Sequence, residues 1–148
     1  HLAELKALFS EMGNTVVAIS PDSKALYHAA AVMVSNQIVA LADMGTALLV
    51  KCGFSEAAAA EALSPLLLGN AQSVAEKGAV NALTGPIERG DAQTVSKHLQ
   101  EIRKFAAEST VGQDILTAYT ALSKQLIRIA QQKHPQKDYK HLEKELEQ

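Results

Sequence analysis

The fold of this protein is decided by residues 20–53, which read SPDSKALYHAAAVMVSNQIVALADMGTALLVKCG. Ser20 is suited to cap a helix and Pro21 to occupy its first position, while Gly53 is suited to end it. Alanine and other apolar residues fill most of the stretch, and alanine has the highest helix propensity. The sequence therefore predicts one long apolar helix from Pro21 to about Cys52.

Polar side chains interrupt the apolar part of this helix, and they are His28, Ser35, Asn36, Gln37 and Asp43. We therefore expect the stretch to fall short of the roughly 20 predominantly apolar residues that a bilayer span needs. A core helix, with no contact to a membrane, is the prediction. Cys52 lies close in the sequence to the apolar residues Leu48, Leu49 and Val50, which favours a reduced, buried thiol over a reactive nucleophile.

Composition and charge limit the class of protein. The chain has 148 residues, 47% of them hydrophobic, and a formal net charge of -2. These values are typical of a globular domain with one core, and the lack of a basic excess argues against nucleic acid as a partner. A single cysteine and the absence of a secretion signal at the start of the sequence predict a cytoplasmic protein.

Glycine and proline divide the rest of the chain into further predicted helices. These cover residues 2–12, 55–78, 91–107 and 110–133. Thr110 and Gln113 have the spacing of a capping box. Residues 134–148 are highly charged, so we expect a marginal solvated helix or tail there. The fold class predicted is all-α, with several helices around one long central helix.

One short segment, Thr-Val-Val-Ala-Ile at residues 15–19, is typical of a β-strand. A lone strand leaves its backbone groups unsatisfied. We therefore expect it to pair with another chain, with a second copy, or with a further domain.

Polar residues form two lines on the long predicted helix. At about 100° per residue, Lys24, His28 and Ser35 project within roughly 40° of one another. Asn36 and Asp43 form the second line. A lysine four residues before a histidine suits a site in which the ammonium donates a proton and the ring orients the substrate. The alternative is a solvated lysine and a hydrogen-bonded core histidine.

The loop at residues 83–91, Leu-Thr-Gly-Pro-Ile-Glu-Arg-Gly-Asp, is the second candidate. Thr84 offers a hydroxyl, Gly85 permits an unusual backbone path, and the Arg89 guanidinium suits a carboxylate or phosphate. The alternative is a tight turn in which Arg89 pairs with a nearby carboxylate of Glu88, Asp91 or Glu101.

Several motifs of known chemistry are absent from the sequence. There is no Gly-x-Gly-x-x-Gly, phosphate-binding loop or paired-cysteine motif, so we do not expect this chain alone to bind a dinucleotide. His134 and His141 lack a third ligand in the sequence nearby, and we expect no metal site. A metal-binding regulator that uses the five histidines is a remote alternative.

Residues 24–36 and 82–91 carry a resemblance to a known family. They resemble the helical C-terminal domain, itself of unknown function, of a family of Rossmann-like oxidoreductases, and the likeness covers about residues 20–130. More distantly, the chain is similar to the C-terminal domains of ketopantoate reductase, pyrroline-carboxylate reductase, and hydroxyacid and phosphogluconate dehydrogenases. The resemblance implies hydride transfer between NAD or NADP, bound on another domain, and a small oxo, imino or hydroxy acid.

The resemblance also implies a division of the chain. Residues 1–20 would be the end of the nucleotide-binding domain, 21–133 the helical substrate and dimerisation domain, and 134–148 a charged tail. The chain would form a homodimer and be inactive without its cofactor domain. A non-enzymatic helical interaction module is the competing hypothesis.

The residue roles follow from the same resemblance. Several relatives carry a catalytic lysine followed one turn later by asparagine; Lys24 matches the first, and His28 stands where asparagine is expected. The implied catalytic residues are thus Lys24 and His28. The implied substrate-binding residues are Ser35, Asn36, Thr84, Gly85 and Arg89.

Overall fold

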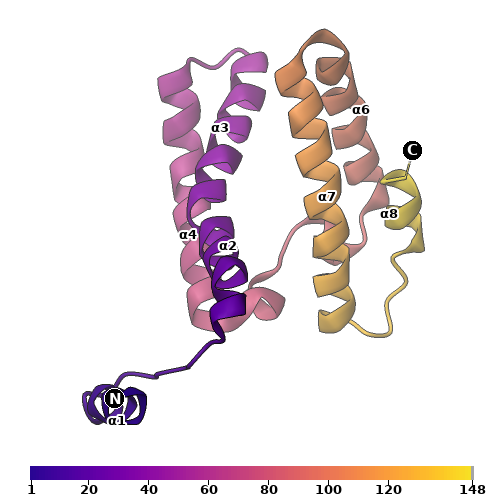
Figure 1. Ribbon diagram of the computed structural model, residues 1–148. Coiled ribbons are helices and arrows are strands. Elements are labelled where there is room, and N and C mark those ends of the chain that lie inside the picture. Colours follow the sequence, from indigo (N-terminus) through magenta and orange to yellow (C-terminus); the bar gives the residue numbers. More distant parts are fainter. Residues whose placement is uncertain (148) are drawn as a thin grey trace. The chain divides into compact units, whose positions relative to one another are not determined.

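The computed structural model describes residues 1–147, and this part of the chain is all-α, as predicted (Figure 1). Its helices are α1 (Leu2–Glu11), the short 3-10 helix η1 (Pro21–Ser23), α2 (Lys24–Val34), α3 (Asn36–Lys51), α4 (Glu56–Ala82), α5 (Pro86–Arg89), α6 (Ala92–Glu108), α7 (Thr110–Lys133) and α8 (Lys140–Glu145). The residues divide into two compact units, one from His1 to Leu41 and the other from Ala42 onward.

The N-terminal unit begins with the predicted first helix. Gly13, with φ of 80°, follows the end of α1 in a backbone conformation that favours glycine. Residues 14–20 adopt neither helix nor strand, so the predicted strand at residues 15–19 is not formed. The physical reason is that residues 1–147 contain no strand with which it could pair.

The long predicted helix forms in pieces. It starts as expected, with the Ser20 hydroxyl accepting a hydrogen bond from the Asp22 amide (3.3 Å) and Pro21 in the first position. The helix is interrupted at Ser35, where φ is -117° and ψ is -77°. The Ser35 hydroxyl donates to the Ala31 carbonyl (2.7 Å), a contact that often bends helices. The helix then continues as α3.

The expected burial of this helix is wrong. Neither α2 nor α3 contains a buried residue, and Cys52, expected to be buried, is exposed. By length and composition alone, Pro21–Lys51 is also long and apolar enough to cross a membrane, with a mean hydropathy of 1.4 in its most apolar window. The expectation that it falls short of a bilayer span is therefore wrong on those two criteria. Helix propensity and side-chain polarity decide where a helix forms, but burial needs neighbouring elements.

The second unit contains the Ala-rich helix α4. Its N-cap is Ser55, the residue at which the sequence predicts this helix to begin, and the Ser55 hydroxyl accepts a hydrogen bond from the Ala58 amide (3.2 Å). The helical conformation passes through Pro65 and breaks at Gly78, where φ is 72° and ψ is 163°. The predicted start is thus confirmed and the predicted end coincides with this break, but helical structure continues beyond it to Ala82, where a loop was expected. Ala59 is the one buried residue of α4.

The buried core of the second unit lies between α6, α7 and the C-terminal segment (Figure 1). Helices α6 and α7 pack against each other, and α8 packs against both. The core consists of Ile87, Val95, Leu99, Ile127, Ala130, Tyr139, Leu142 and Leu146.

The turn between α6 and α7 differs from its prediction by one residue. Ser109, and not Thr110, caps α7: its hydroxyl accepts a hydrogen bond from the Gly112 amide (3.0 Å). Both residues have suitable side chains, but Ser109 has the extended backbone (φ -156°, ψ 152°) that a capping residue needs.

The prediction of a solvated C-terminal segment is also wrong. Tyr139, Leu142 and Leu146 are only 2%, 1% and 5% exposed. Their spacing of three and four residues places them on one side of the chain around α8, and this side packs against the core. Three apolar residues are enough to pack a charged segment against the core, because they share one face.

Candidate functional site

The backbone of loop 83–91 is fixed by its glycines. Gly85 precedes α5 with φ of 99°, and Gly90 follows it in the left-handed conformation with φ of 71°. Both values favour glycine, since a side chain would be strained there. Within the loop, the Asp91 amide donates to the Pro86 carbonyl (2.8 Å). The sequence therefore builds a tight, hydrogen-bonded turn around the four residues of α5.

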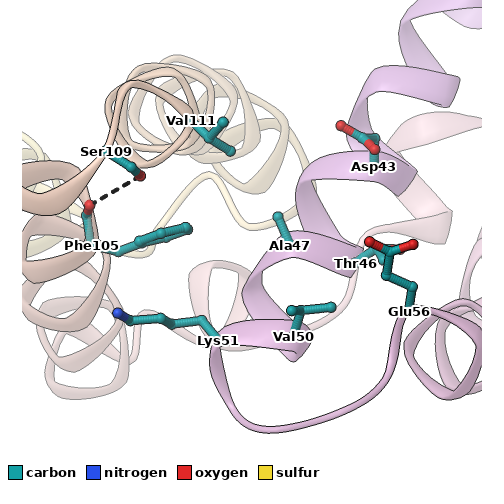
Figure 2. A pocket seen from close by; sticks show the side chains of 9 residues that line it. All are labelled: Asp43, Thr46, Ala47, Val50, Lys51, Glu56, Phe105, Ser109 and Val111. Carbon is teal, nitrogen blue, oxygen red and sulfur yellow. Dashed lines mark hydrogen bonds between the residues drawn. The ribbon is translucent and has the colours of Figure 1, made fainter.

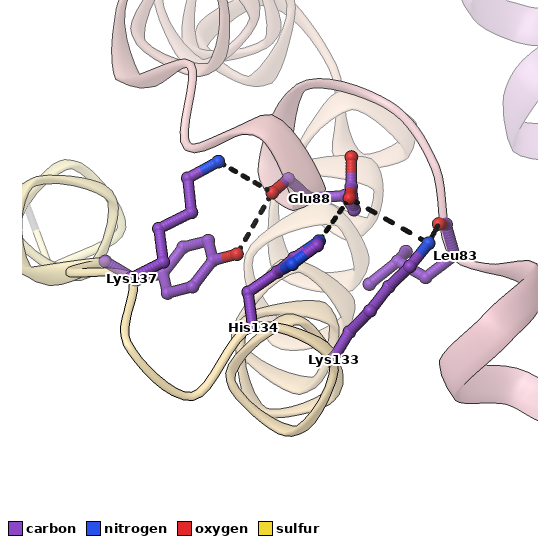
Figure 3. A network of polar contacts seen from close by, with 6 residues as sticks. Leu83, Glu88, Lys133, His134 and Lys137 are labelled. Carbon is purple, nitrogen blue, oxygen red and sulfur yellow. Dashed lines mark hydrogen bonds and ion pairs between the residues drawn. The ribbon is translucent and has the colours of Figure 1, made fainter.

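Glu88 anchors this loop to the end of α7 (Figure 3). Its carboxylate accepts a hydrogen bond from His134 Nε2 at 2.5 Å and lies 3.8 Å from the Lys133 ammonium. Lys133 also donates to the carbonyl of Leu83 (2.8 Å), at the start of the loop. The side chains of two successive residues thus hold the loop.

The main-chain carbonyl of Glu88 accepts hydrogen bonds from residues that follow α7 (Figure 3). It accepts hydrogen bonds from the buried Tyr139 hydroxyl (3.0 Å) and from Lys137 Nζ (3.3 Å). The Lys137 ammonium also lies 5.8 Å from the centre of the Tyr139 ring, within reach of a cation–π interaction. Residues 133–139 therefore hold Glu88 at both its side chain and its backbone.

The electrostatics follow from these contacts. The hydrogen bond from His134 is the largest cause that lowers the pKa of Glu88 below its ordinary 4.5, and the positive charge of Lys133 adds to it. Burial raises the pKa of the Tyr139 phenol, and the negative charge of Glu88 raises it further. At neutral pH the carboxylate is thus charged and the phenol keeps the proton that it donates.

Asp91 ends the loop and caps α6. Its carboxylate accepts hydrogen bonds from the Thr94 hydroxyl (2.7 Å) and the Thr94 amide (3.0 Å). These two bonds are the largest causes that lower the pKa of Asp91, and the nearby charge of Arg89 contributes less. Asp91 is thus the N-cap of α6, the helix that the sequence predicts to begin at this residue.

Arg89 is exposed, and its guanidinium forms no hydrogen bond or ion pair with residues 1–147, although its main-chain amide donates to the Gly85 carbonyl (3.1 Å). The sequence left open whether it pairs with one of three nearby carboxylates, and each of them has another partner. Glu88 is bound by His134, Asp91 by Thr94, and Glu101 by Lys104. Thr84 is exposed on the same loop. Within the part of the chain that the structure describes, the loop therefore presents a guanidinium without a hydrogen-bonded or ion-paired partner, which suits a carboxylate or another anion.

The other predicted site residues belong to the N-terminal unit. Lys24, His28, Ser35 and Asn36 are all exposed, and the Ser35 hydroxyl contacts Asn36 Oδ1 (3.0 Å). Lys24 and His28 share α2, as predicted, and neither side chain has a polar partner in the described residues. The structure brings Thr84, Gly85 and Arg89 together on the loop of the second unit.

A pocket of about 620 Å³ lies in the second unit, and none of the predicted site residues lines it (Figure 2). It is formed by the end of α3, the start of α4 and the turn between α6 and α7. The ammonium of Lys51 forms an ion pair with Glu108 and lies 5.5 Å from the centre of the Phe105 ring. The lining residues are Asp43, Thr46, Ala47, Val50, Lys51, Glu56, Phe105, Ser109 and Val111.

Sequence reasoning missed the anchoring residues. It considered Glu88 only as a partner of Arg89 and treated residues 134–148 as solvated. The spacing of Tyr139, Leu142 and Leu146 was the available signal, because it predicts one apolar face. No sequence signal linked Glu88 to His134, 46 residues away. Among the described residues, no group of three His, Cys, Asp or Glu is placed to hold a metal ion, and His134 instead binds Glu88.

Together, the fold and the loop define an all-α domain that presents a fixed turn with a free guanidinium. Many unrelated proteins contain all-α domains of this kind, and sequence comparison identifies the family to which this one belongs. The chain belongs to the family described as "Domain of unknown function (DUF2520)", whose family model matches residues 1–126. Comparisons with curated proteins and with solved structures found no match.

Proposed function

We propose that this chain is the substrate-binding and dimerisation domain of a cytoplasmic NAD(P)-dependent oxidoreductase that acts on a small oxo, imino or hydroxy acid. The observation that carries the proposal is the free guanidinium of Arg89 on a rigid loop. A small organic acid has the carboxylate that such a group binds. The Thr84 hydroxyl and the backbone at Gly85 complete the substrate contacts.

The nicotinamide cofactor would be held by another domain and would supply or accept the hydride. Residues 1–147 contain no strand followed by a glycine-rich turn and a helix, so they do not fit a dinucleotide. The part of this chain is to bind the acid and to move a proton. Lys24 is the candidate proton donor to the substrate oxygen or nitrogen, and His28, four residues later, either orients the same atom or is itself the acid. Ser35 belongs to the same polar line and offers a hydroxyl, and Asn36, on the second polar line, offers an amide.

The first test concerns substrate binding in the full-length enzyme. Arg89→Ala should raise KM for the acid by about tenfold or more, because a hydrogen bond to a charged group contributes about 1.5–3 kcal/mol. Arg103→Ala, on the neighbouring helix α6, is the control. A panel of small 2-oxo acids with NADH and NADPH supplies the assay, and an unchanged KM would remove Arg89 from the substrate site.

The second test concerns the division of labour between domains. Calorimetric titration of this chain with NADH and NADPH should show no saturable binding. Tight binding of either dinucleotide would mean that the cofactor site has been placed on the wrong domain.

One observation favours a second candidate, a non-enzymatic helical interaction module. The large apolar residues Leu26, Tyr27, Met33 and Val34 of α2 are between 62% and 76% exposed, as expected of a surface that binds another helix. The discriminating observation is the reading frame upstream of His1. A glycine-rich strand–turn–helix sequence there supports the enzyme, whereas a start codon directly before His1 supports the module.

A further inference from the structure

The C-terminal segment, residues 133–147, lies beyond the part of the chain that matches the family, which ends at residue 126. Yet this segment supplies all the side chains that hold Glu88: Lys133, His134, Lys137 and Tyr139. Tyr139 is 2% exposed, so the segment is packed into the core. A feature of this chain outside the family match therefore controls the loop that carries the candidate anion site.

We propose that the C-terminal segment keeps the carboxylate of Glu88 away from Arg89, and so leaves the Arg89 guanidinium free for a carboxylate ligand. Glu88 and Arg89 are adjacent in the chain, so the Glu88 carboxylate is one of two acidic side chains that could compete for the guanidinium; the other, Asp91, is bound by Thr94. This proposal rests on the proposed function, in which Arg89 contacts the acid. Lys133, His134 and Tyr139 are positioning residues in it.

The argument depends on competition for one carboxylate. Glu88 is held by His134 at 2.5 Å and by Lys133 at 3.8 Å, and its side chain is only 19% exposed. Both partners are cations or hydrogen-bond donors, so together they bind the negative charge of the Glu88 carboxylate. Without these partners, the Glu88 side chain would be free to rotate toward Arg89. Without them, Glu88 would occupy the guanidinium from within the loop, and an external carboxylate would have to displace it.

The backbone contact fixes the direction in which the side chain of Glu88 leaves the loop. The Tyr139 hydroxyl and the Lys137 ammonium both bind its carbonyl oxygen, at 3.0 and 3.3 Å. A peptide held at its carbonyl cannot rotate freely, so the side chain continues to point toward the end of α7 (Figure 3). The two sets of contacts thus act together. The hydrogen bonds to the Glu88 carbonyl set the direction of its side chain, and the contacts of its carboxylate hold the negative charge near the end of α7.

The test measures binding of pyruvate, the probe for a small oxo acid, to the 148-residue chain by NMR titration of the loop amides. Replacement of both Lys133→Ala and His134→Ala should weaken binding by about two- to fivefold, the range for an exposed ion pair that now competes. Adding Glu88→Gln to this variant should restore the wild-type affinity, because glutamine carries no competing charge. Glu88→Gln alone should bind pyruvate as the wild type does.

The matched control replaces Lys140→Ala and His141→Ala, an exposed lysine and histidine of α8 that do not contact Glu88. Restoration by Glu88→Gln separates the proposal from a general loss of structure, since a disordered loop would not be repaired by it. Unchanged binding in the double-alanine variant, or no restoration by Glu88→Gln, overturns the proposal.

A ligand-free measurement keeps the proposal separate from the proposed function. Hydrogen exchange at the amides of Arg89, Gly90 and Asp91 should become faster in Tyr139→Phe. It should stay unchanged in Tyr119→Phe, which removes a hydroxyl bonded to His98 instead. Unchanged exchange in Tyr139→Phe overturns the positioning role even if pyruvate binds. Faster exchange together with no pyruvate binding by any variant supports that role and instead overturns Arg89 as a substrate contact.

Discussion

At the scale of single residues, Glu88 determines the chemistry of the candidate site. Its carboxylate and its carbonyl are committed to different partners, all contributed by residues 133–139. Asp91, three residues later, is committed to the cap of α6. Because both acidic neighbours of Arg89 are occupied, the positive charge of Arg89 remains available to a ligand.

The lowered pKa of Glu88 predicts a loss of stability in acid. A carboxyl whose pKa is lower in the folded state stabilises the fold above its unfolded pKa of about 4.5, and this contribution disappears as the pH falls through the folded value. The thermal midpoint should therefore fall less with acid in Glu88→Gln than in the wild type. Circular dichroism melts from about pH 7 to about pH 3 measure this, with Glu61→Gln as the control. Parallel curves for wild type and Glu88→Gln would contradict the assigned hydrogen bond.

The proposed proton-transfer pair gives a second prediction at this scale. In the full-length enzyme, Lys24→Ala and His28→Ala should each lower kcat by about a hundredfold or more, the range expected when general acid catalysis is lost. Lys77→Ala, an exposed lysine on α4, should leave kcat unchanged. Steady-state kinetics with a saturating 2-oxo acid measure kcat for each variant. Normal turnover in both variants would exclude the pair from the mechanism.

At the scale of elements, the turn between α6 and α7 sets how closely the two helices approach. A Cβ atom on Gly112 would lie 2.4 Å from the carbonyl oxygen of Phe105 and 2.6 Å from the amide nitrogen of Ala106. Both are main-chain atoms, which cannot move aside without shifting the end of α6. The glycine is therefore required by close packing and not by an unusual φ.

Gly112→Ala should destabilise the protein by about 1–3 kcal/mol, the typical cost of overpacking. Gly69→Ala is the matched control, because a Cβ there meets no atom within 4 Å. That substitution should leave stability unchanged or raise it, since alanine is favoured over glycine in a helix. Urea unfolding followed by circular dichroism compares the two, and equal midpoints would contradict the packing argument.

The C-terminal helix α8 gives a prediction opposite to the sequence-based expectation that this segment is solvated. Leu142→Ala should cost about 2–5 kcal/mol, as for other buried leucines, because its side chain is 1% exposed. Leu68→Ala, where the leucine is 66% exposed, should change stability little. The same urea experiment measures both. A negligible effect of Leu142→Ala would mean that residues 134–147 are solvated after all.

At the scale of the whole molecule, the chain leaves much apolar surface uncovered. Leu26, Val34 and Val39 in the N-terminal unit are 76%, 71% and 70% exposed, and Leu66 and Leu68 in α4 are 62% and 66% exposed. Exposed apolar patches of this kind mark interaction surfaces. We propose a second copy of the chain as the partner, and not a lipid bilayer, because the polar side chains along Pro21–Lys51 would be costly in hydrocarbon.

The chain should therefore have twice its 15.8 kDa mass when measured by light scattering after gel filtration. Val34→Lys and Leu68→Lys should shift this mass toward the monomer, since each places a charge in an apolar interface. Leu122→Lys, on α7, is the control. A monomeric wild type that binds to lipid vesicles would contradict the dimer and favour a membrane partner.

The sequence was most informative where the signal is local. Helix ends were predicted to within a few residues at Gly13, Ser55, Asp91 and Lys133, because caps, glycines and prolines act through neighbouring backbone atoms. It was least informative about burial. The apolar helix at residues 21–51 was expected in the core and contains no buried residue, whereas the charged segment after Pro135 was expected in solvent and packs against the core through Tyr139, Leu142 and Leu146.

The candidate site divides in the same way. The residue types of loop 83–91 left two interpretations open, a site that offers Arg89 and a tight turn in which Arg89 pairs with a nearby carboxylate, and the structure has the turn without that pairing. That Arg89 is free depends on Glu88 meeting His134 and Tyr139, which lie 46 and 51 residues away along the chain.

The sequence by itself determined that the chain is helical, where most of its helices begin and end, and which polar groups stand together on one helix or loop. Only the tertiary structure decided which apolar side chains are buried and which carboxylates are already occupied. The physical reason is range. Backbone hydrogen bonds and capping act over about four residues, whereas burial and ion pairing depend on atoms that come together only when distant segments pack.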